Sequence, residues 1–481
     1  MNRATLGGGW RTAGLGCAAG FALSALSAQP LFPTNPPPWL ARPLSLADCL
    51  NLALSQNADV LKSRKDLEAA HGVSVQTRAI VFPKVQAGAN YSAVEDSAVD
   101  RFEFPATPFL PPGFNGIDPG TENWSADIRL VQSLYEGGRL RSSLRTARLL
   151  REQALAQHNA ILANTATDVR VAYYDVLLAD QQIRVREASV QLLEKELEDS
   201  QRRFSAGTVP RFNVLRVEVE LANARPDLSR ARNAYRISKN LLVHLLGYHV
   251  PRDIWDDIPL RLSDGLDVPK LEVAVPEALA QALALRPELA AMRKAEELRR
   301  EGVVQARAGY QPRLEGYVGY AARKSMFSPA LDREVHGWEG GVAAAWSLFD
   351  GAFTRGRVLE SRALLEKAEI EHEDLARKIE LEVRTAYSTL VEAWEVRASQ
   401  QKVLESAAEA LRLARARAEA GTGTQLDVLG AQTALTEART TEIRAKREYA
   451  VARARLERAM GSGGQSRLLS SDGRRLSNSR D

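Results

Sequence analysis

Cysteine and histidine are scarce in this sequence, which holds two cysteines and six histidines among 481 residues. Loss of the leader described below would leave Cys49 as the single thiol, so we expect a core thiol and no intrachain disulfide. The histidines are scattered and do not form the helical i, i+4 pattern of a metal site. Phosphate-binding loops and nucleophile motifs are also missing, so the sequence predicts no metal site, no cofactor and no catalytic residues.

Long apolar runs are missing too. Beyond residue 28 no stretch of 18 or more apolar residues occurs, which excludes a membrane-spanning helix of ordinary length. If the chain crosses a bilayer, it must do so as a closed β-barrel, because every backbone polar group in lipid needs a partner. Aromatic residues make up only 6% of the chain, and the net charge is +4. Charge this small predicts no nucleic-acid partner.

The N-terminus has the order of a secretory leader. Arg3 and Arg11 precede the apolar run Leu15–Leu26, and small residues then offer a cleavage point, so residues 1–28 are predicted to be a signal peptide. A disordered N-terminus with a chance apolar run is the alternative. A lipid anchor on Cys17 is disfavoured, because Gly14 stands where a bulky aliphatic residue is usual.

What the sequence does contain is an internal duplication. Ser133-Leu-Tyr-Glu-Gly-Gly returns as Ser347-Leu-Phe-Asp-Gly-Ala, and further matches downstream keep the same offset of 214 residues (347 − 133). Upstream the offset is 229, as between Pro83 and Pro312 (312 − 83). The first copy therefore holds about 15 extra residues, which we expect in the Pro- and Gly-rich stretch 104–120.

Each copy is predicted to contain two strands followed by two very long helices. The expected strands cover about 84–94, 123–135, 313–323 and 337–349, and the expected long helices about 139–205, 212–246, 354–419 and 426–460. A single helix over 45–81 precedes the first strand. The resulting division is a signal peptide 1–28, a Pro-rich lead 29–44, a first repeat 45–250, a linker 251–275, a second repeat 276–461 and a disordered tail 462–481.

The strands alternate apolar and polar residues over about ten positions, the length of a strand that crosses a bilayer. Trp124, Trp338 and Trp346 lie near strand ends and would suit an aromatic girdle at the membrane interface. An amphipathic hairpin in a soluble sheet is the alternative. The helix over 139–205 lacks proline and glycine and would be on the order of 100 Å long.

These features together resemble the outer-membrane efflux protein (TolC-like) family of Gram-negative bacteria, over about residues 45–461. The stretches that carry the resemblance are Ser133-Leu-Tyr-Glu-Gly-Gly, Ser347-Leu-Phe-Asp-Gly and Ala420-Gly-Thr-Gly-Thr-Gln-Leu-Asp-Val-Leu. The resemblance implies a mainly α fold with a membrane β-barrel. It further implies a homotrimer, with a shared twelve-stranded barrel in outer-membrane lipid and an α-helical tunnel in the periplasm.

The resemblance also implies a function, which is a passive exit duct of a tripartite efflux or type I secretion system. Its partners would be a periplasmic adaptor protein and an inner-membrane transporter, and its cargo small molecules or polypeptides. The alternative is a periplasmic coiled-coil adaptor or scaffold without a pore. The four alternating runs argue against that alternative, because adaptors carry compact soluble β-domains and shorter helical hairpins. Neither prediction requires an enzyme.

In that family the second periplasmic turn and the helix after it line a constriction. The resemblance implies that Asp427 is one acid of a ring there, whereas Gly430 and Gly423 stand where some members have a second acid and a basic residue. We hypothesise that three copies of Asp427 form a weakly cation-favouring narrow point. An ordinary N-cap or solvated helix acid is the alternative for Asp427.

The two far turns of the helical hairpins are the expected adaptor contacts. The residues concerned are Gly207, Thr208, Val209, Pro210, Gly421 and Thr422. The two glycines have an alternative role, which is only to turn the chain.

Overall fold

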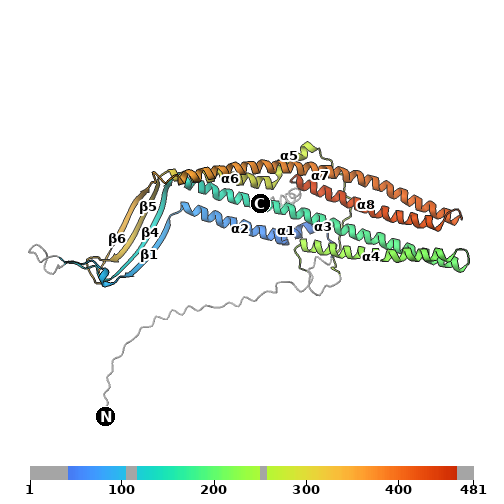
Figure 1. The fold of residues 1–481 in the computed structure, drawn as a ribbon, viewed down its shortest axis with the longest axis horizontal. Helices are drawn as coiled ribbons and strands as arrows, with labels where there is room; N and C mark the ends of the chain where they lie inside the picture. Colours follow the sequence, from blue (N-terminus) through green and yellow to red (C-terminus); the bar gives the residue numbers. More distant parts are fainter. Residues whose placement is uncertain (1–41, 104–115, 250–256, 463–481) are drawn as a thin grey trace, which may run out of the picture.

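The computed structural model describes residues 42–103, 116–249 and 257–462, which form an elongated molecule with a β-sheet at one end and long helices beyond it (Figure 1). The predicted signal peptide, most of the Pro-rich lead, residues 104–115 of the expected insertion, residues 250–256 and the tail from residue 463 lie outside this description. Among the described residues, no helix is both long and apolar enough to span a membrane.

The two halves of the chain contribute matching sets of helices and main strands. The first set is α1 (Leu46–Gln56), α2 (Ala58–Arg78), β1 (Lys84–Ala93), β4 (Glu122–Glu136), α3 (Arg139–Ser205) and α4 (Arg211–Leu245). The second set is α5 (Val275–Leu285), α6 (Pro287–Arg307), β5 (Arg313–Lys324), β6 (Glu334–Ala345), α7 (Phe353–Glu419) and α8 (Gln425–Ala459). The minor elements are the strands β2 (Phe102–Glu103) and β3 (Gly116–Ile117) and the 3₁₀ turns Ala79–Val81, Asp96–Ala98 and Ala308–Tyr310.

Equal helix lengths confirm the predicted duplication. The helices α3 and α7 both have 67 residues, and α4 and α8 both have 35. The short pairs also match, at 11 residues for α1 and α5 and 21 residues for α2 and α6. The described chain is therefore a mainly α fold built from two copies of one hairpin-plus-helices unit.

The helix expected over 45–81 is wrong as a single helix, because it breaks at Asn57. The side-chain Oδ1 of Asn57 accepts a hydrogen bond from the N–H of Asp59 at 2.8 Å, which caps the start of α2. Its Nδ2 donates to the carbonyl of Leu245 at 2.8 Å and so joins the break to the end of α4. The second copy has the matching break at Arg286.

The main sheet has four antiparallel strands in the order β1-β4-β5-β6, which leaves β1 and β6 as its edges. Strand register divides its residues between two faces. The apolar face carries Val85, Tyr91, Ile128, Leu130, Val318, Tyr320, Trp338 and Val342. The polar face carries Gln86, Asn90, Asp127, Arg129, Glu315 and Glu339. Both edges and most of the apolar face are exposed in the single chain.

The last strand, β6, begins and ends earlier than the expected range of 337–349. It pairs with β5 from Glu334, opposite Lys324, to Ala345, opposite Arg313. Pro312 precedes β5 and has no N–H to donate, so the ladder stops there. Trp346 and the residues after it therefore lie beyond the strand.

The helices form a layer whose membership changes along its length (Figure 1). Near the sheet the neighbours run in the order α2, α3, α6, α7, and further away in the order α4, α3, α8, α7. The two long helices α3 and α7 continue through both parts. Two buried clusters lie where the change occurs, one around Tyr173 and Leu246 and the other around Ile379 and Leu456.

The segment 257–274 crosses the helices at that level and links the two copies. Its Leu262 pairs in parallel with Leu44, and the ammonium of the buried Lys239 donates to the carbonyl of Ile258 at 2.9 Å. At its other end the carbonyl of Pro269 accepts a hydrogen bond from the hydroxyl of Tyr449 at 3.1 Å. The segment is therefore fixed to α4 and to α8.

Candidate functional site

The helical hairpins turn at the end of the molecule opposite the sheet (Figure 1). At each turn a glycine adopts left-handed backbone angles, with φ of +75° at Gly207 and +74° at Gly421. The N–H of Thr208 donates to the carbonyl of Arg203 at 3.0 Å, and the N–H of Thr422 to that of Arg417 at 2.9 Å. These bonds form a Schellman motif at the end of each long helix, so both glycines have a clear role in turning the chain.

The second turn ends in a capping box at the start of α8. The carboxylate of Asp427 accepts hydrogen bonds from the N–H of Thr424 at 2.9 Å and from its hydroxyl at 2.7 Å. The N–H of Asp427 donates back to that hydroxyl at 3.2 Å. The hydrogen bonds from Thr424 hold the pKa of Asp427 below its ordinary value. In the single chain this acid thus serves as a capping residue and remains exposed.

The first turn is built differently. Pro210 occupies the N-cap position of α4, which has no side-chain cap. Asn213 stands where the second copy has Asp427, 214 residues later. The two turns therefore share a backbone shape and differ in charge and in capping.

Gly423 and Gly430 lie on either side of the capping box but in different surroundings. A Cβ at Gly423 would come within 2.9 Å of the Cβ of Arg417 and 3.0 Å of the backbone nitrogen of Ala418, so a larger residue would not fit. A Cβ at Gly430 would meet nothing within 4 Å. Packing against α7 accounts for Gly423, whereas no contact within the chain requires Gly430.

The three tryptophans of the expected aromatic girdle occupy different levels of the sheet. The indole N–H of Trp124 donates to the carbonyl of Leu331 at 3.0 Å, at the loop end. That of Trp346 donates to the carbonyl of Tyr310 at 3.1 Å, at the helical end. Trp338, 79% exposed, lies between them on the apolar face, with its ring edge-on to Tyr320 at 5.5 Å.

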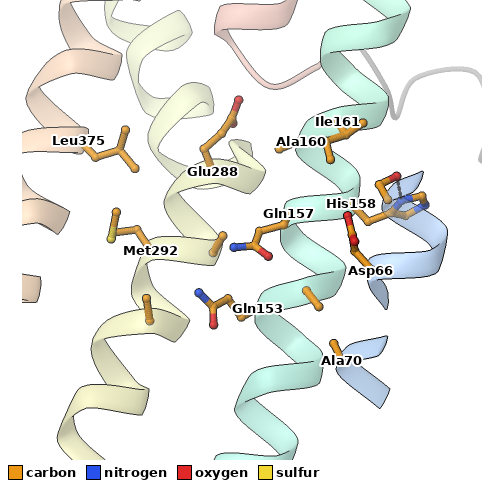
Figure 2. A pocket seen from close by; sticks show the side chains of 14 residues that line it. Asp66, Ala70, Gln153, Gln157, His158, Ala160, Ile161, Glu288, Met292 and Leu375 are labelled. Atoms are coloured by element: carbon orange, nitrogen blue, oxygen red, sulfur yellow. Dashed lines mark hydrogen bonds between the residues drawn. The ribbon is translucent and has the colours of Figure 1, made fainter. Parts of the chain in front are cut away.

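A groove of about 570 Å³ lies among α2, α3, α6 and α7 on the sheet side of the helical layer (Figure 2). The hydroxyl of Ser63 and the Nδ1 of His158 hydrogen-bond there at 2.8 Å. Burial, with the charge of Arg64, lowers the pKa of His158. Throughout the described ranges, no group of three or more His, Cys, Asp or Glu side chains could hold a metal ion.

Sequence reasoning missed an ion-pair cluster at the second helix break, here named the Arg286 cluster: Arg286, Glu288, Glu382 and Arg458. The Arg286 side chain is 4% exposed and donates to Glu288 at 3.1 Å and to Glu382 at 2.5 Å. Arg458 donates to the same two carboxylates. The cluster joins α6, α7 and α8. The duplication offered no signal for it, because Asn57 is the counterpart of Arg286.

Comparison with known proteins identifies relatives across the described fold. The chain matches the family described as outer membrane efflux protein over residues 49–248 and 278–462. It is 26% identical to the alkaline protease secretion protein AprF of Pseudomonas aeruginosa, covering 86% of this chain and 83% of that protein. It is 24% identical to the cobalt-zinc-cadmium resistance protein CzcC of Cupriavidus metallidurans, covering 86% and 88%. The solved outer-membrane channel OprN superposes with a TM-score of 0.72 at 20% identity, over 87% of this chain and 90% of that one.

Proposed function

The chain belongs to the outer membrane efflux protein family, and we propose that three copies of it form one continuous exit duct. As a member of the family it is an outer-membrane channel of a Gram-negative bacterium, with its helical part in the periplasm. Its relatives serve efflux and type I secretion. The family and its structural neighbours are channel proteins.

The open sheet is the observation that carries the three-copy proposal. Four strands leave the backbone groups of β1 and β6 without a neighbour on their outer sides. Such edges need a partner in lipid, since no water is present there to satisfy them. Pairing β6 of one copy with β1 of the next would close three four-stranded sheets into a twelve-stranded barrel.

The two faces of the sheet support an orientation for that barrel. The apolar face, where Val342 is 67% exposed and Trp338 79% exposed, would contact lipid. The polar face, which carries Asp127, Arg129 and Glu339, would line the lumen. Helices of 67 residues would continue this lumen for on the order of 100 Å into the periplasm.

The far turns are the proposed docking sites for a periplasmic adaptor, which would couple the duct to an inner-membrane transporter. Gly207, Thr208, Val209 and Pro210 form one docking turn, and Gly421 and Thr422 the other. The relatives are named for two kinds of cargo, a protease and metal ions. We propose passive transport of a polypeptide or a small solute that the transporter delivers.

Asp427 remains our candidate for the narrowest point, together with the unfilled positions Gly423 and Gly430. Three converging carboxylates would favour cations even while each caps its own helix, because a capped carboxylate keeps its charge. Replacing Asp427 with Asn should shift the cation-to-anion permeability ratio toward anions in a planar bilayer. An unchanged ratio would remove Asp427 from the constriction and leave it only the capping role.

The duct is tested with the mature full-length protein extracted from outer membranes. Single-particle images should show a threefold tapered cylinder, and the same preparation should give discrete conductance steps in a planar bilayer. Thin rods or compact particles without a threefold axis, together with no conductance, would overturn the duct and favour a periplasmic adaptor or scaffold. Disulfide trapping between cysteines introduced in β1 and β6 would report the proposed strand pairing separately.

A further inference from the structure

An ion pair crosses the middle of the sheet on its polar face. Strand register places Arg129 of β4, Gly319 of β5 and Glu339 of β6 in one row, each directly opposite the next. The guanidinium of Arg129 donates to the carboxylate of Glu339 at 2.6 Å. The arginine therefore reaches over the whole width of β5 to a strand that is not its neighbour.

Two glycines make this reach possible. At Gly319 a Cβ would come within 3.3 Å of the Cβ of Arg129 and 2.7 Å of the carbonyl oxygen of Ile128. At Gly341 a Cβ would lie 2.9 Å from the hydroxyl of Tyr317, so the phenol ring lies flat across β6. The guanidinium carbon of Arg129 lies 5.6 Å from the centre of that ring. Both large side chains are thus laid along the sheet and do not project away from it.

The pair also decides the charge of this part of the face. Of the six residues that β6 turns to the polar side, only Glu339 is charged, and the others are Val335, Gly337, Gly341, Ala343 and Ala345. The side chains of Arg129 and Glu339 are 42% and 45% exposed. An ion pair this exposed contributes little to stability, because solvent screens it and ordering two long side chains costs entropy. Stability alone does not account for a row kept clear by glycine.

We propose that the Arg129–Glu339 pair determines the ion selectivity of the duct at the level of the sheet. This rests on the proposed function, in which the polar face lines the lumen. Each copy then contributes one arginine that its own glutamate neutralises, so the lumen stays wide and carries little fixed charge at this level. Loss of either partner would leave three like charges around one narrow, low-dielectric passage, where their fields add.

Reversal potentials in a planar bilayer under a salt gradient test the pair through a double-substitution cycle. Glu339→Gln leaves Arg129 unneutralised and should shift the permeability ratio a few-fold toward anions. Arg129→Gln leaves Glu339 unneutralised and should shift it a few-fold toward cations. The double variant should return to the wild-type ratio. Glu334→Gln removes the same charge at the loop end of β6, on the other face, and should change nothing.

The outcomes separate this inference from the proposed function. If the wild-type protein conducts and both single variants keep its permeability ratio, the pair does not set selectivity. The same holds if the double variant behaves as the sum of two independent shifts in one direction. A wild-type protein that forms threefold particles but does not conduct would overturn the proposed duct, and the selectivity role with it.

Discussion

Backbone angles at single residues shape the far turns, and they predict the effect of one methyl group. Gly207 and Gly421 have positive φ, and an added Cβ would meet nothing within 4 Å in the chain. Replacing either with Ala should therefore cost about 1 kcal/mol through backbone strain alone. The midpoint of thermal unfolding in detergent should fall. Ala352→Gly, at a φ of +69°, is the reciprocal control and should raise it.

Capping at the start of α8 is a second property of single residues. Thr424→Ala removes the hydroxyl of the capping box and should weaken the first turn by on the order of 1 kcal/mol. Amide hydrogen exchange at residues 425–428 should speed up. Asn213→Ala, at the first turn, where no side-chain cap exists, should leave exchange in α4 unchanged. Equal effects at both turns would contradict the capping role.

The same cap has a defined pH dependence. Because the pKa of Asp427 is lowered in the folded chain, its carboxylate contributes fully above its ordinary value of 3.8. This contribution should be lost as the pH falls through the lowered value. Exchange at the first turn of α8 should therefore be independent of pH between 5 and 7, once corrected for the intrinsic chemical rate. A change within that window would point to another titrating group.

Among the elements, the Arg286 cluster joins three helices at one break. Burial opposes ionisation of Glu288, but hydrogen bonds from Arg286 outweigh it and hold the pKa of Glu288 below 4.5. Arg286→Ala would leave buried carboxylate charge short of a partner and should cost about 3 kcal/mol in free energy of unfolding. Denaturant unfolding measures this loss. Arg300→Ala, which breaks an exposed pair with Glu296, should cost less than about 1 kcal/mol.

The stability that Arg286 confers should depend on pH with a known sign. The pKa of Glu288 is lowered by folding, so its contribution is present above about pH 4.5 and is lost as the pH falls below that value. The difference between wild type and Arg286→Ala should therefore shrink in acid. A difference that grows below pH 4.5 would contradict the cluster as described.

Element boundaries were predictable where a single physical cause acts. The helix α3 fills the proline- and glycine-free stretch 139–205 because nothing within it interrupts the hydrogen bonds. The break at Asn57 was missed because asparagine does not oblige a helix to end; its partner, the carbonyl of Leu245, is distant in sequence. Pro287, at the matching position of the second copy, was the available signal. The early end of β6 depends on Pro312 in another strand, which alternation within β6 does not reveal.

For the whole molecule, the alternation of the strands predicts which substitutions block membrane insertion. Val342→Arg places a charge on the apolar face and should cost about 2–4 kcal/mol in lipid. The amount of protein in outer-membrane fractions should fall. Ala343→Arg adds the same side chain one residue later, on the polar face, and should insert normally. Equal losses would mean that the two faces do not divide between lipid and lumen.

The duplication and the family could be read from the sequence because order and offset persist over the whole chain. The candidate constriction could be read only in part. Sequence placed Asp427 at a turn, but its hydrogen bonds to Thr424 depend on side-chain geometry. Assembly is a property of several copies, and one chain supports it only through its open strand edges.

The identical lengths of the paired helices carry a consequence for how this fold changes over evolutionary time. One inserted residue would rotate everything after it by 100° and move it by about 1.5 Å, which would turn every packed side chain away from its partner. The two copies accordingly differ in residue type along the helices but not in length. Length has changed instead between β1 and β4, where 28 residues (94–121) stand against nine (325–333) between β5 and β6. New sequence is tolerated at that end of the molecule, and an epitope or a binding peptide grafted there should leave the rest of the chain in register.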